Sequence, residues 1–441
     1  MPNRARRNRA AMRAAALALA MLTAMLPGAD PAWAAAIWLY EMATPDQGTA
    51  AAGRAALAVD ASTAWLNPAG MTRLDRSQLL IGAGALVIQS EFDIAPGTTE
   101  SGGGANITSA LPSASGYYVQ SFSAAPDFKL GASLTTLPGL AADYGDTWAG
   151  RYFMEKAALI GVALSGTAAY RILPWLSVGG GLSLGHSHLA QDTALNNVLD
   201  RLPDGTVEIR GDAWGVGGLF GIMIEPIPNT RIGVQYTSPM TFQYNNIIDS
   251  VRGAGPALQA FRLLVGAVVD IPVGSQVDLK LTMPQQIMAS AYHAFTDQFA
   301  MMVNFGWQNW SAYGQPSLVI SGNPNRRLNP DQGYEDTYHT AIGAHYRVAP
   351  DWLLKAGFAY DTSAVSDANR TLGFPVDRQF RYALGVQYAV SKNITLGTDL
   401  TIIDAGSAPI NQSGGPLRGT LVGSYSPNLL YAIGFNLIWR F

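Results

Sequence analysis

Large apolar residues alternate with small or polar residues along much of the chain, which is the period of a β-strand that has one apolar face. In the segment 429–441, every odd position is large and apolar, whereas the even positions include Gly434, Asn436 and Arg440. Segments 352–360 and 380–390 alternate in the same way. Such a face can pack in a soluble β-sandwich or contact lipid, so alternation alone leaves both folds open.

Strand length and connection length separate these two folds. The pattern predicts strands at 78–93, 115–123, 127–136, 155–171, 174–190, 205–225, 229–245, 275–295, 297–320, 333–348, 351–363, 375–390, 392–407 and 427–441. Short turns rich in Pro, Asp and Asn alternate with long connections at 94–114, 137–154, 191–204, 246–274, 321–332, 364–374 and 408–426. An even number of strands, most of them longer than about 10 residues, with short turns on one side and long loops on the other, is typical of bacterial outer-membrane barrels. The sequence therefore predicts an all-β fold, a 14-stranded antiparallel transmembrane β-barrel over residues 78–441, with both ends of the mature chain at the periplasmic side.

The first residues have the pattern of a secretory signal peptide. Five arginines between Arg4 and Arg13 precede the apolar run 14–26, and the small-residue site Ala32-Trp33-Ala34 follows. A membrane-anchoring helix would need about 20 apolar residues, more than this run supplies. We therefore expect residues 1–34 to be a signal peptide that is removed after Ala34.

Residues 35–77 are Ala-rich and precede the first strand, and the run 50–57 predicts a short helix. A segment this small cannot fold alone, so we expect it to form an N-terminal hatch that plugs the barrel lumen. Two long loops also have helical patterns, at 194–202 and 256–269. The second carries Leu258, Phe261 and Leu264, and exposed apolar side chains of this kind mark a binding site or a packing partner.

Composition agrees with a surface that faces lipid. Only 13% of the 441 residues are charged, about half the usual share, whereas 48% are hydrophobic. The chain has 28 basic and 31 acidic residues; without residues 1–34 it keeps 23 and 30, a net charge of −7. This charge excludes nucleic-acid binding, and the absence of cysteine excludes disulfides, thiolate metal sites and a cysteine nucleophile.

Several motifs resemble those of the FadL-type outer-membrane transporters. The start of the mature chain at 35–41, the tripeptide Asn67-Pro68-Ala69 with Gly70 after it, and the segments 236–239, 283–286 and 346–361 carry this resemblance, which spans nearly the whole mature chain. It implies a monomeric barrel in the Gram-negative outer membrane, surrounded by lipid and lipopolysaccharide, with no cofactor or metal. Its implied function is passive, gated uptake of hydrophobic molecules, first of all long-chain fatty acids; the alternative is uptake of neutral aromatic or aliphatic hydrocarbons by the same mechanism, as in the TodX-like members.

The resemblance also implies roles for individual residues. Apolar extracellular loops capture the ligand, here through Leu258, Phe261 and Leu264, and the hatch turn Asn67, Pro68, Ala69 and Gly70 forms the gate. The ligand leaves sideways through a kinked third strand. This strand contains Gly131, the candidate kink residue, and ends toward Pro138-Gly139, which are also compatible with a kink.

Candidate contacts for a fatty-acid carboxylate come from strand parity and from the resemblance. Arg347, Lys355 and Arg381 occupy positions that face the lumen on this parity, and a cation there can bind a carboxylate. Fatty-acid members carry a cationic residue toward the top of the fifth strand, where this chain has His186 and His188. Because no motif fixes that position, the charge of the substrate stays open.

Three other functions compete with transport. The first is a lipid-acting enzyme, for which His339 and His345 are candidates although no nucleophile motif accompanies them, so we expect no catalytic residue and no metal site. The second is a general porin, which would lack a hatch. The third is a surface receptor, whose partner would bind the long loops.

Overall fold

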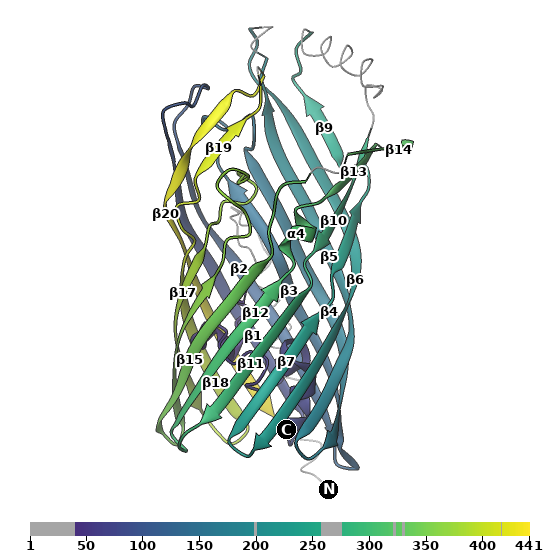
Figure 1. Ribbon diagram of the computed structural model, residues 1–441, viewed down its shortest axis with the longest axis vertical. Helices are drawn as coiled ribbons and strands as arrows, with labels where there is room; N and C mark the ends of the chain where they lie inside the picture. Colours follow the sequence, from purple (N-terminus) through teal and green to yellow (C-terminus); the bar gives the residue numbers. More distant parts are fainter. Residues whose placement is uncertain (1–39, 198–200, 257–275, 321–322, 329–330, 416) are drawn as a thin grey trace, which may run out of the picture. The chain divides into compact units, whose positions relative to one another are not determined.

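The computed structural model describes residues 40–197, 201–256, 276–320, 323–328, 331–415 and 417–441. Its strands form one barrel (Figure 1). The predicted signal peptide, 1–34, lies outside the described residues, as do the capture residues Leu258, Phe261 and Leu264. No helix in the described ranges is both long and apolar enough to cross a membrane.

Fourteen of the described strands follow one another around the barrel, each antiparallel to its neighbours, and the last pairs with the first. They are β1 (Gln78–Ile94), β2 (Ala105–Phe122), β3 (Ala125–Asp143), β4 (Lys156–Leu173), β5 (Leu176–Leu195), β6 (Gly205–Ile227), β7 (Thr230–Thr237), β11 (Gln286–Ala294), β12 (Phe299–Gln308), β15 (Thr337–Ala349), β16 (Trp352–Asp361), β17 (Gln379–Ala389), β18 (Ile394–Asp404) and β20 (Thr420–Arg440). The predicted fold class is thus confirmed. The β1–β20 pairing closes the sheet, so the backbone satisfies its hydrogen bonds within the wall, except where residues 105–115 of β2 do not pair with β3.

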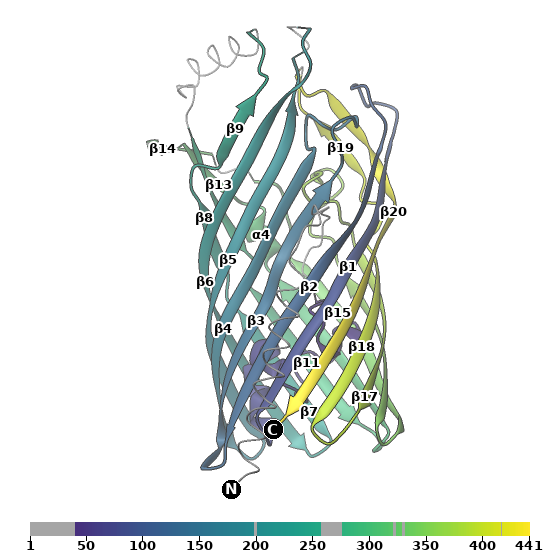
Figure 2. The same ribbon diagram turned by 180° about the vertical axis from the view of Figure 1, so that it is seen from behind.

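The connections alternate in length as predicted. Short turns such as 174–175 and 350–351 lie at one end, which we call the short-turn end, and the long connections lie at the other, the long-loop end. The chain ends at the short-turn end, and the hatch lies inside the barrel near it (Figures 1 and 2). Two further strands at the long-loop end extend the wall: β9 (Ile248–Arg252) pairs with β6, and β19 (Ile410–Ser413) pairs with β20.

Side chains alternate across the wall as the sequence indicates. Odd positions of the last strand, such as Ile433 and Phe435, are exposed on the outside, whereas Ala432, Asn436 and Ile438 are buried inside. Leu384 on β17 is 63% exposed. An apolar side chain this exposed on the outer face of a barrel is typical of one that contacts lipid.

Three predicted strands are shorter in the barrel than the sequence suggested. The predicted strands 229–245, 275–295 and 297–320 each break before the long-loop end, two of them beside Pro239 and Pro284, where the backbone N–H for a ladder bond is missing. Their outer parts form a separate sheet. It consists of β8 (Met240–Tyr244), β10 (Val277–Met283), β13 (Ser317–Ile320) and β14 (Asn323–Leu328), and the short helix α4 (Trp310–Tyr313) lies between β12 and β13.

Other boundaries also differ from the predictions. Strand β2 begins at Ala105 rather than at 115, so the loop before it is shorter than predicted. The predicted loop helix at 194–202 is wrong at its start, because Ala194 and Leu195 end strand β5 in register with Thr206 and Gly205. The predicted loop helix at 256–269 lies outside the described residues beyond Pro256.

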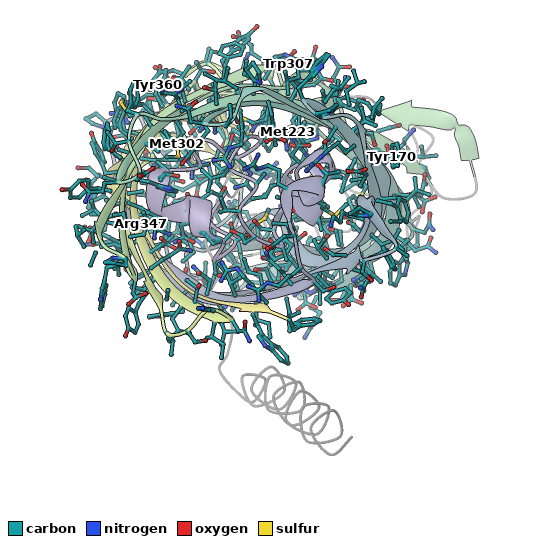
Figure 3. All side chains as sticks on the ribbon, turned by 90° about the horizontal axis from the view of Figure 1, so that it is seen from below. Tyr170, Met223, Met302, Trp307, Arg347 and Tyr360 are labelled. Atoms are coloured by element: carbon teal, nitrogen blue, oxygen red, sulfur yellow. The ribbon has the colours of Figure 1, made fainter. Side chains whose placement is uncertain are left out.

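The hatch consists of short elements joined by turns: η1 (Pro45–Thr49), α2 (Thr63–Leu66) and η2 (Pro68–Arg73). Seen along the barrel, its helical turns lie inside the ring of strands (Figure 3). The predicted helix at 50–57 is wrong: Ala50 and Ala51 adopt left-handed backbone conformations with φ of 53° and 65°, which a right-handed helix does not allow. The segment turns there and rests on the barrel wall.

Candidate functional site

At several places the backbone of the hatch lies directly against glycines of the barrel wall. A Cβ added to Gly357 on β16 would collide with the Thr49 carbonyl, and one added to Gly233 on β7 would collide with the Ala55 carbonyl. Glycine at these two positions therefore lets the hatch backbone lie directly against the barrel backbone. The part of the lumen next to the short-turn end is filled in this way.

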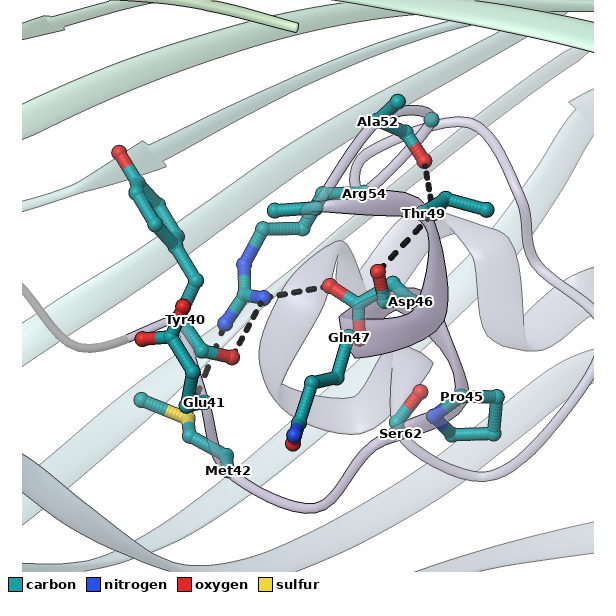
Figure 4. A network of polar contacts seen from close by, with 12 residues as sticks. Tyr40, Glu41, Met42, Pro45, Asp46, Gln47, Thr49, Ala52, Arg54 and Ser62 are labelled. Carbon is teal, nitrogen blue, oxygen red and sulfur yellow. Dashed lines mark hydrogen bonds and ion pairs between the residues drawn. The ribbon is translucent and has the colours of Figure 1, made fainter. Parts of the chain in front are cut away.

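A network of charges holds the first hatch residues in shape. Arg54 donates to Asp46 Oδ2 at 2.5 Å and to the Tyr40 carbonyl at 3.5 Å, and all three residues are buried (Figure 4). Thr49 Oγ1 donates to the Asp46 carbonyl and lies 3.0 Å from the Ala52 carbonyl. The turn is therefore fixed by its own polar groups.

Two predicted lumenal cations join this hatch to the wall. Arg381 forms an ion pair with Glu41 of the hatch and donates from Nε to Asp361 Oδ2 at 2.9 Å. Lys355 forms an ion pair with Asp399 and donates to the Pro45 carbonyl at 2.8 Å. Both cations point inward as predicted, and both have carboxylate partners, so here they act as anchors of the hatch. Their role as contacts for a ligand headgroup is untested.

The gate residues lie together at the base of the hatch. The Asn67 amide donates to the Ala55 carbonyl at 2.6 Å and to the Ile222 carbonyl of β6 at 3.0 Å. Its Oδ1 accepts from the Ala69 backbone at 3.1 Å, while Pro68 begins η2. Gly70 packs against Ala58, where an added Cβ would come within 2.9 Å of the alanine Cβ. Asn67 therefore ties two parts of the hatch to the barrel wall.

The wall itself has a gap between β2 and β3. These strands pair from Gly116 opposite Leu134 down to the short turn at Phe122 and Ala125. Beyond this stretch, residues 105–115 of β2 pair with β1, and residues 135–143 of β3 pair with β4, but the two strands do not pair with each other. We call this unpaired stretch the lateral gap; it lies in the part of the wall that faces the viewer in Figure 2.

Of the two kink-compatible positions in β3, Pro138-Gly139 coincides with the irregularity of the strand and Gly131 does not. The β3–β4 register shifts between Leu137 and Leu140, around Pro138-Gly139, whereas Gly131 pairs regularly with Val119 and Thr167. A Cβ on Gly131 would come within 2.5 Å of Met71 Sδ in the hatch. The prediction that Gly131 is the kink residue is thus wrong: its lack of a side chain makes room for the hatch.

Apolar side chains fill the lumen beside the lateral gap. They come from the first three strands, from the last strand and from the long connections. We call them the upper cluster, whose members include Ile88, Phe92, Ile107, Ala142, Tyr144, Trp148, Val376, Tyr425 and Leu430. A closed cavity of about 10 Å³ within it is lined by Ile107 of β2, Ala142 of β3 and Leu430 of β20. The cavity therefore reaches both strands that flank the gap, and the space in this conformation is about that of one water.

One aromatic residue, Tyr425, lines this cavity and belongs to a group of packed aromatic rings in the upper cluster. The Tyr144 and Tyr425 hydroxyls lie 2.5 Å apart, and the Tyr144 ring stacks on Trp148 with ring centroids 4.6 Å apart. Phe92 contacts the edges of Trp148 and Tyr425. A ligand larger than a water must therefore displace residues of the lining, among them Tyr425, which packs against the other rings.

His188 does not face the lumen. On β5 the odd positions point inward, because Ser177 bonds to Thr72 of the hatch at 2.8 Å and Gly179 lies against Pro68. His188 lies on the opposite face, 3.0 Å from Asp212 of β6, so the prediction of a lumenal contact is wrong. Arg347 does face inward, but at the short-turn end, below the hatch.

The histidines do not form the arrangement of a hydrolase. His339 Nδ1 lies 2.8 Å from Asp361 Oδ1, but its Nε2, where a triad would place a serine, has no hydrogen-bond partner in the described part of the chain. Across the described ranges, no cluster of three or more His, Asp or Glu side chains could hold a metal ion.

Glu155, just before β4 at the long-loop end, is expected to make this region sensitive to pH. Burial, followed by the charges of Asp146, Asp192 and Asp204, raises its pKa to about 7 from 4.5. Because the pKa of Glu155 is higher in the folded protein, its protonated form stabilises the fold. This contribution to the free energy of unfolding is complete below pH 4.5 and is lost as the pH rises through 7. We expect Glu155→Gln to remove this loss, measured as the melting midpoint of the protein from pH 4 to about 8. An equally steep pH dependence in the variant would contradict the assignment.

The sequence patterns missed the carboxylates that complete the anchors. Glu41, Asp361 and Asp399 are buried inside the barrel. The alternation along each strand indicates that Asp361 and Asp399 point into the barrel. Their pairing with the cations depends on cross-strand register, which strand patterns alone do not fix.

Comparison with known proteins places these features in a wider context. The family model described as "Outer membrane protein transport protein (OMPP1/FadL/TodX)" matches residues 25–436. A long-chain fatty acid transport protein of Salmonella typhi is 27% identical over 412 residues, which cover 90% of this chain and 93% of that protein. A FadL homologue from Pseudomonas aeruginosa has a similar fold, with a TM-score of 0.79 at 19% identity over 92% of this chain and 100% of the other. The Ralstonia pickettii toluene transporter TbuX is similar with a TM-score of 0.61 at 19% identity, covering 91% of this chain and 100% of the other.

Proposed function

Because the chain belongs to the OMPP1/FadL/TodX family of outer membrane transport proteins, we propose that it mediates passive, gated uptake of hydrophobic molecules across the outer membrane. Long-chain fatty acids are the proposed substrate class, as the name of the Salmonella relative suggests. In this setting the short-turn end is periplasmic and the long-loop end extracellular. The protein acts as a transporter in this proposal and needs no catalytic residue.

One observation carries the proposal: an apolar cavity reaches both strands beside a gap in the wall of a barrel whose axial path is plugged. The cavity contacts Ile107 on one side of the lateral gap and Ala142 on the other. A hydrophobic solute loses favourable free energy whenever it enters water, so a side passage from an apolar lumen into the membrane keeps it out of water. A porin, in contrast, offers a water-filled path.

The long loops and the hatch give the steps before and after this cavity. We propose that Leu258, Phe261 and Leu264 capture the solute outside the cell. Displacement of the aromatic rings of the upper cluster admits the solute, and movement of the hatch turn at Asn67 opens the gate. We propose that the protein works as a monomer, surrounded by membrane lipid and lipopolysaccharide.

A second candidate substrate class is the neutral aromatic or aliphatic hydrocarbons. The polar groups that line the cavity are uncharged and already paired: Ser90 Oγ donates to Asn428 Oδ1 at 2.7 Å, and the Asn428 amide donates to the Pro375 carbonyl at 3.0 Å. Such a lining offers nothing to balance a carboxylate charge, which favours a solute without one.

Filling the cavity is expected to stop uptake. In the variant Ala142→Trp, the indole is larger than the cavity in this conformation and takes the volume that a ligand would use once the lining is displaced. We therefore expect uptake of labelled oleate by cells that lack their own transporter to fall at least about tenfold. The matched control Ala132→Trp changes an exposed outward position on the same strand and should leave uptake unchanged. A folded Ala142→Trp protein with full uptake would contradict the proposed path. Labelled toluene in the same cells, and mass spectrometry of the ligand that copurifies with the wild-type protein, distinguish the two substrate classes.

A further inference from the structure

An open cavity lies at the periplasmic mouth, below the hatch. Its volume is about 600 Å³, within the range of pockets that hold small organic ligands. Its lining has an apolar part: Leu57 and Val59 of the hatch, with Leu353 and Ile438 of the wall. Val59 is 41% exposed to this space. The hatch thus presents an apolar surface to the periplasm.

The same cavity has a polar part in which cations outnumber anions. Four cationic side chains line it, Arg76, Arg347, Lys392 and Arg440, together with three carboxylates, Asp75, Asp297 and Asp351. The mature chain as a whole has a net charge of −7, so this mouth is more positive than the rest of the molecule. Arg76 and Arg440 already bond to Asn393 and Thr395, at 2.9 and 2.8 Å.

Two successive inward positions on β15 have hydrogen-bonding capacity to spare. Arg347 is exposed, and its guanidinium donates to the Pro350 carbonyl at 3.1 Å, which uses one of its five N–H groups. His345 lines the cavity one inward position deeper, is 9% exposed, and has no hydrogen-bond partner for its Nε2. A buried ring nitrogen without a partner is costly, and a bound acceptor would remove that cost.

We propose that the periplasmic mouth is a second ligand site, which binds an amphiphilic carboxylate with its headgroup at Arg347 and His345 and its chain along Leu57 and Val59. A guanidinium binds a carboxylate through charge-assisted hydrogen bonds, and the neutral imidazole can donate a further one from Nε2. The proposal deepens the proposed function, because it gives a fatty acid, as opposed to a neutral hydrocarbon, a place on the periplasmic side of the hatch.

The test uses the mature chain in lipid nanodiscs, with ¹⁵N-labelled histidine and octanoate as the probe. We expect a saturable shift of the His345 resonance, which a His345→Gln variant assigns, and an affinity about tenfold weaker in Arg347→Gln, the effect of losing one charged contact. Arg347→Lys keeps the charge and should stay within about threefold of the wild type. Arg378→Gln, which removes a cation at the other end of the barrel, should leave the affinity unchanged.

Two further arms separate the headgroup from the chain and this site from the transport path. Octanol has the same chain without the charge, so its weaker binding should not respond to Arg347→Gln; inorganic phosphate tests whether an anion alone suffices. Ala142→Trp fills the upper cavity and should not change the His345 shift, so a failure of the uptake proposal would leave this result intact. An octanoate shift equal to that of octanol, or one unaffected by Arg347→Gln, would overturn the site.

Discussion

Deletion of residues 35–77 is expected to turn the plugged barrel into a leaky pore. The hatch elements fill the lumen near the periplasmic end, and their backbone lies directly on the wall at Gly233 and Gly357. Without them, water enters the lumen and hydrates Lys355 and Arg381. This hydration replaces the contacts of the two cations with the Pro45 carbonyl and Glu41 of the hatch. The barrel should therefore survive, because its strand pairing does not include the hatch.

We expect the influx of small polar solutes to rise at least about tenfold in liposome swelling, and conductance steps to appear in planar bilayers. The control Val59→Ala alters the hatch surface without removing its anchors and should stay closed. Heat-dependent mobility on gels confirms that the deleted protein is a folded barrel. A folded deletion variant as tight as the wild type would show that the upper cluster alone closes the lumen.

The substitution Arg381→Met is expected to loosen the hatch more than any other single change. It leaves Glu41 of the hatch and Asp361 of the wall buried without their shared cation. Removing one partner of a buried ion pair typically costs about 3–5 kcal/mol, because the remaining charge stays buried and unpaired. We expect this cost to appear in the docking of the hatch, seen as faster hydrogen exchange over residues 40–57.

A second substitution tests that cause. In the double variant Arg381→Met with Glu41→Gln, one of the two unpaired charges is gone, and hatch protection should return in part. Arg378→Met, in which the lost cation belongs to a more exposed pair with Asp404, should leave the hatch unaffected. Normal hatch protection in Arg381→Met would mean that backbone contacts, and not the ion pairs, hold the hatch.

The barrel could be predicted because its rule is local and repeated. Each strand shows its outward face by large apolar residues at alternate positions, and turn residues mark the short connections, so the architecture followed from the pattern. The same rule failed where proline removes a ladder bond, at Pro239 and Pro284. It also failed where a strand continues through a segment rich in turn residues, at 105–114, which contains Ser109, Pro112 and Ser113. Both failures concern parts of the wall at the long-loop end.

The site was harder to predict because it depends on contacts between distant segments. The inward parity of Lys355 and Arg381 was correct, but their carboxylate partners come from the hatch and from neighbouring strands, whose register no local pattern reveals. His188 was misplaced because the family resemblance indicates a height on the fifth strand but not a face, and even positions of β5 such as Leu182 and Leu184 face outward. The glycines show the same limit: Gly131 suits a kink, yet in the structure it accommodates Met71 of the hatch.

The closing pair of strands has a consequence for assembly. β1 follows the hatch directly in sequence and pairs along most of its length with β20, the strand of the barrel that is farthest from it along the chain. The cylinder therefore cannot be sealed until β20 has been delivered. Because Gly233 and Gly357 leave no clearance between hatch and wall, threading the hatch into a finished cylinder would require the wall to part. We therefore expect the hatch to be enclosed as the barrel curls around it, with the β1–β20 seam zipped last.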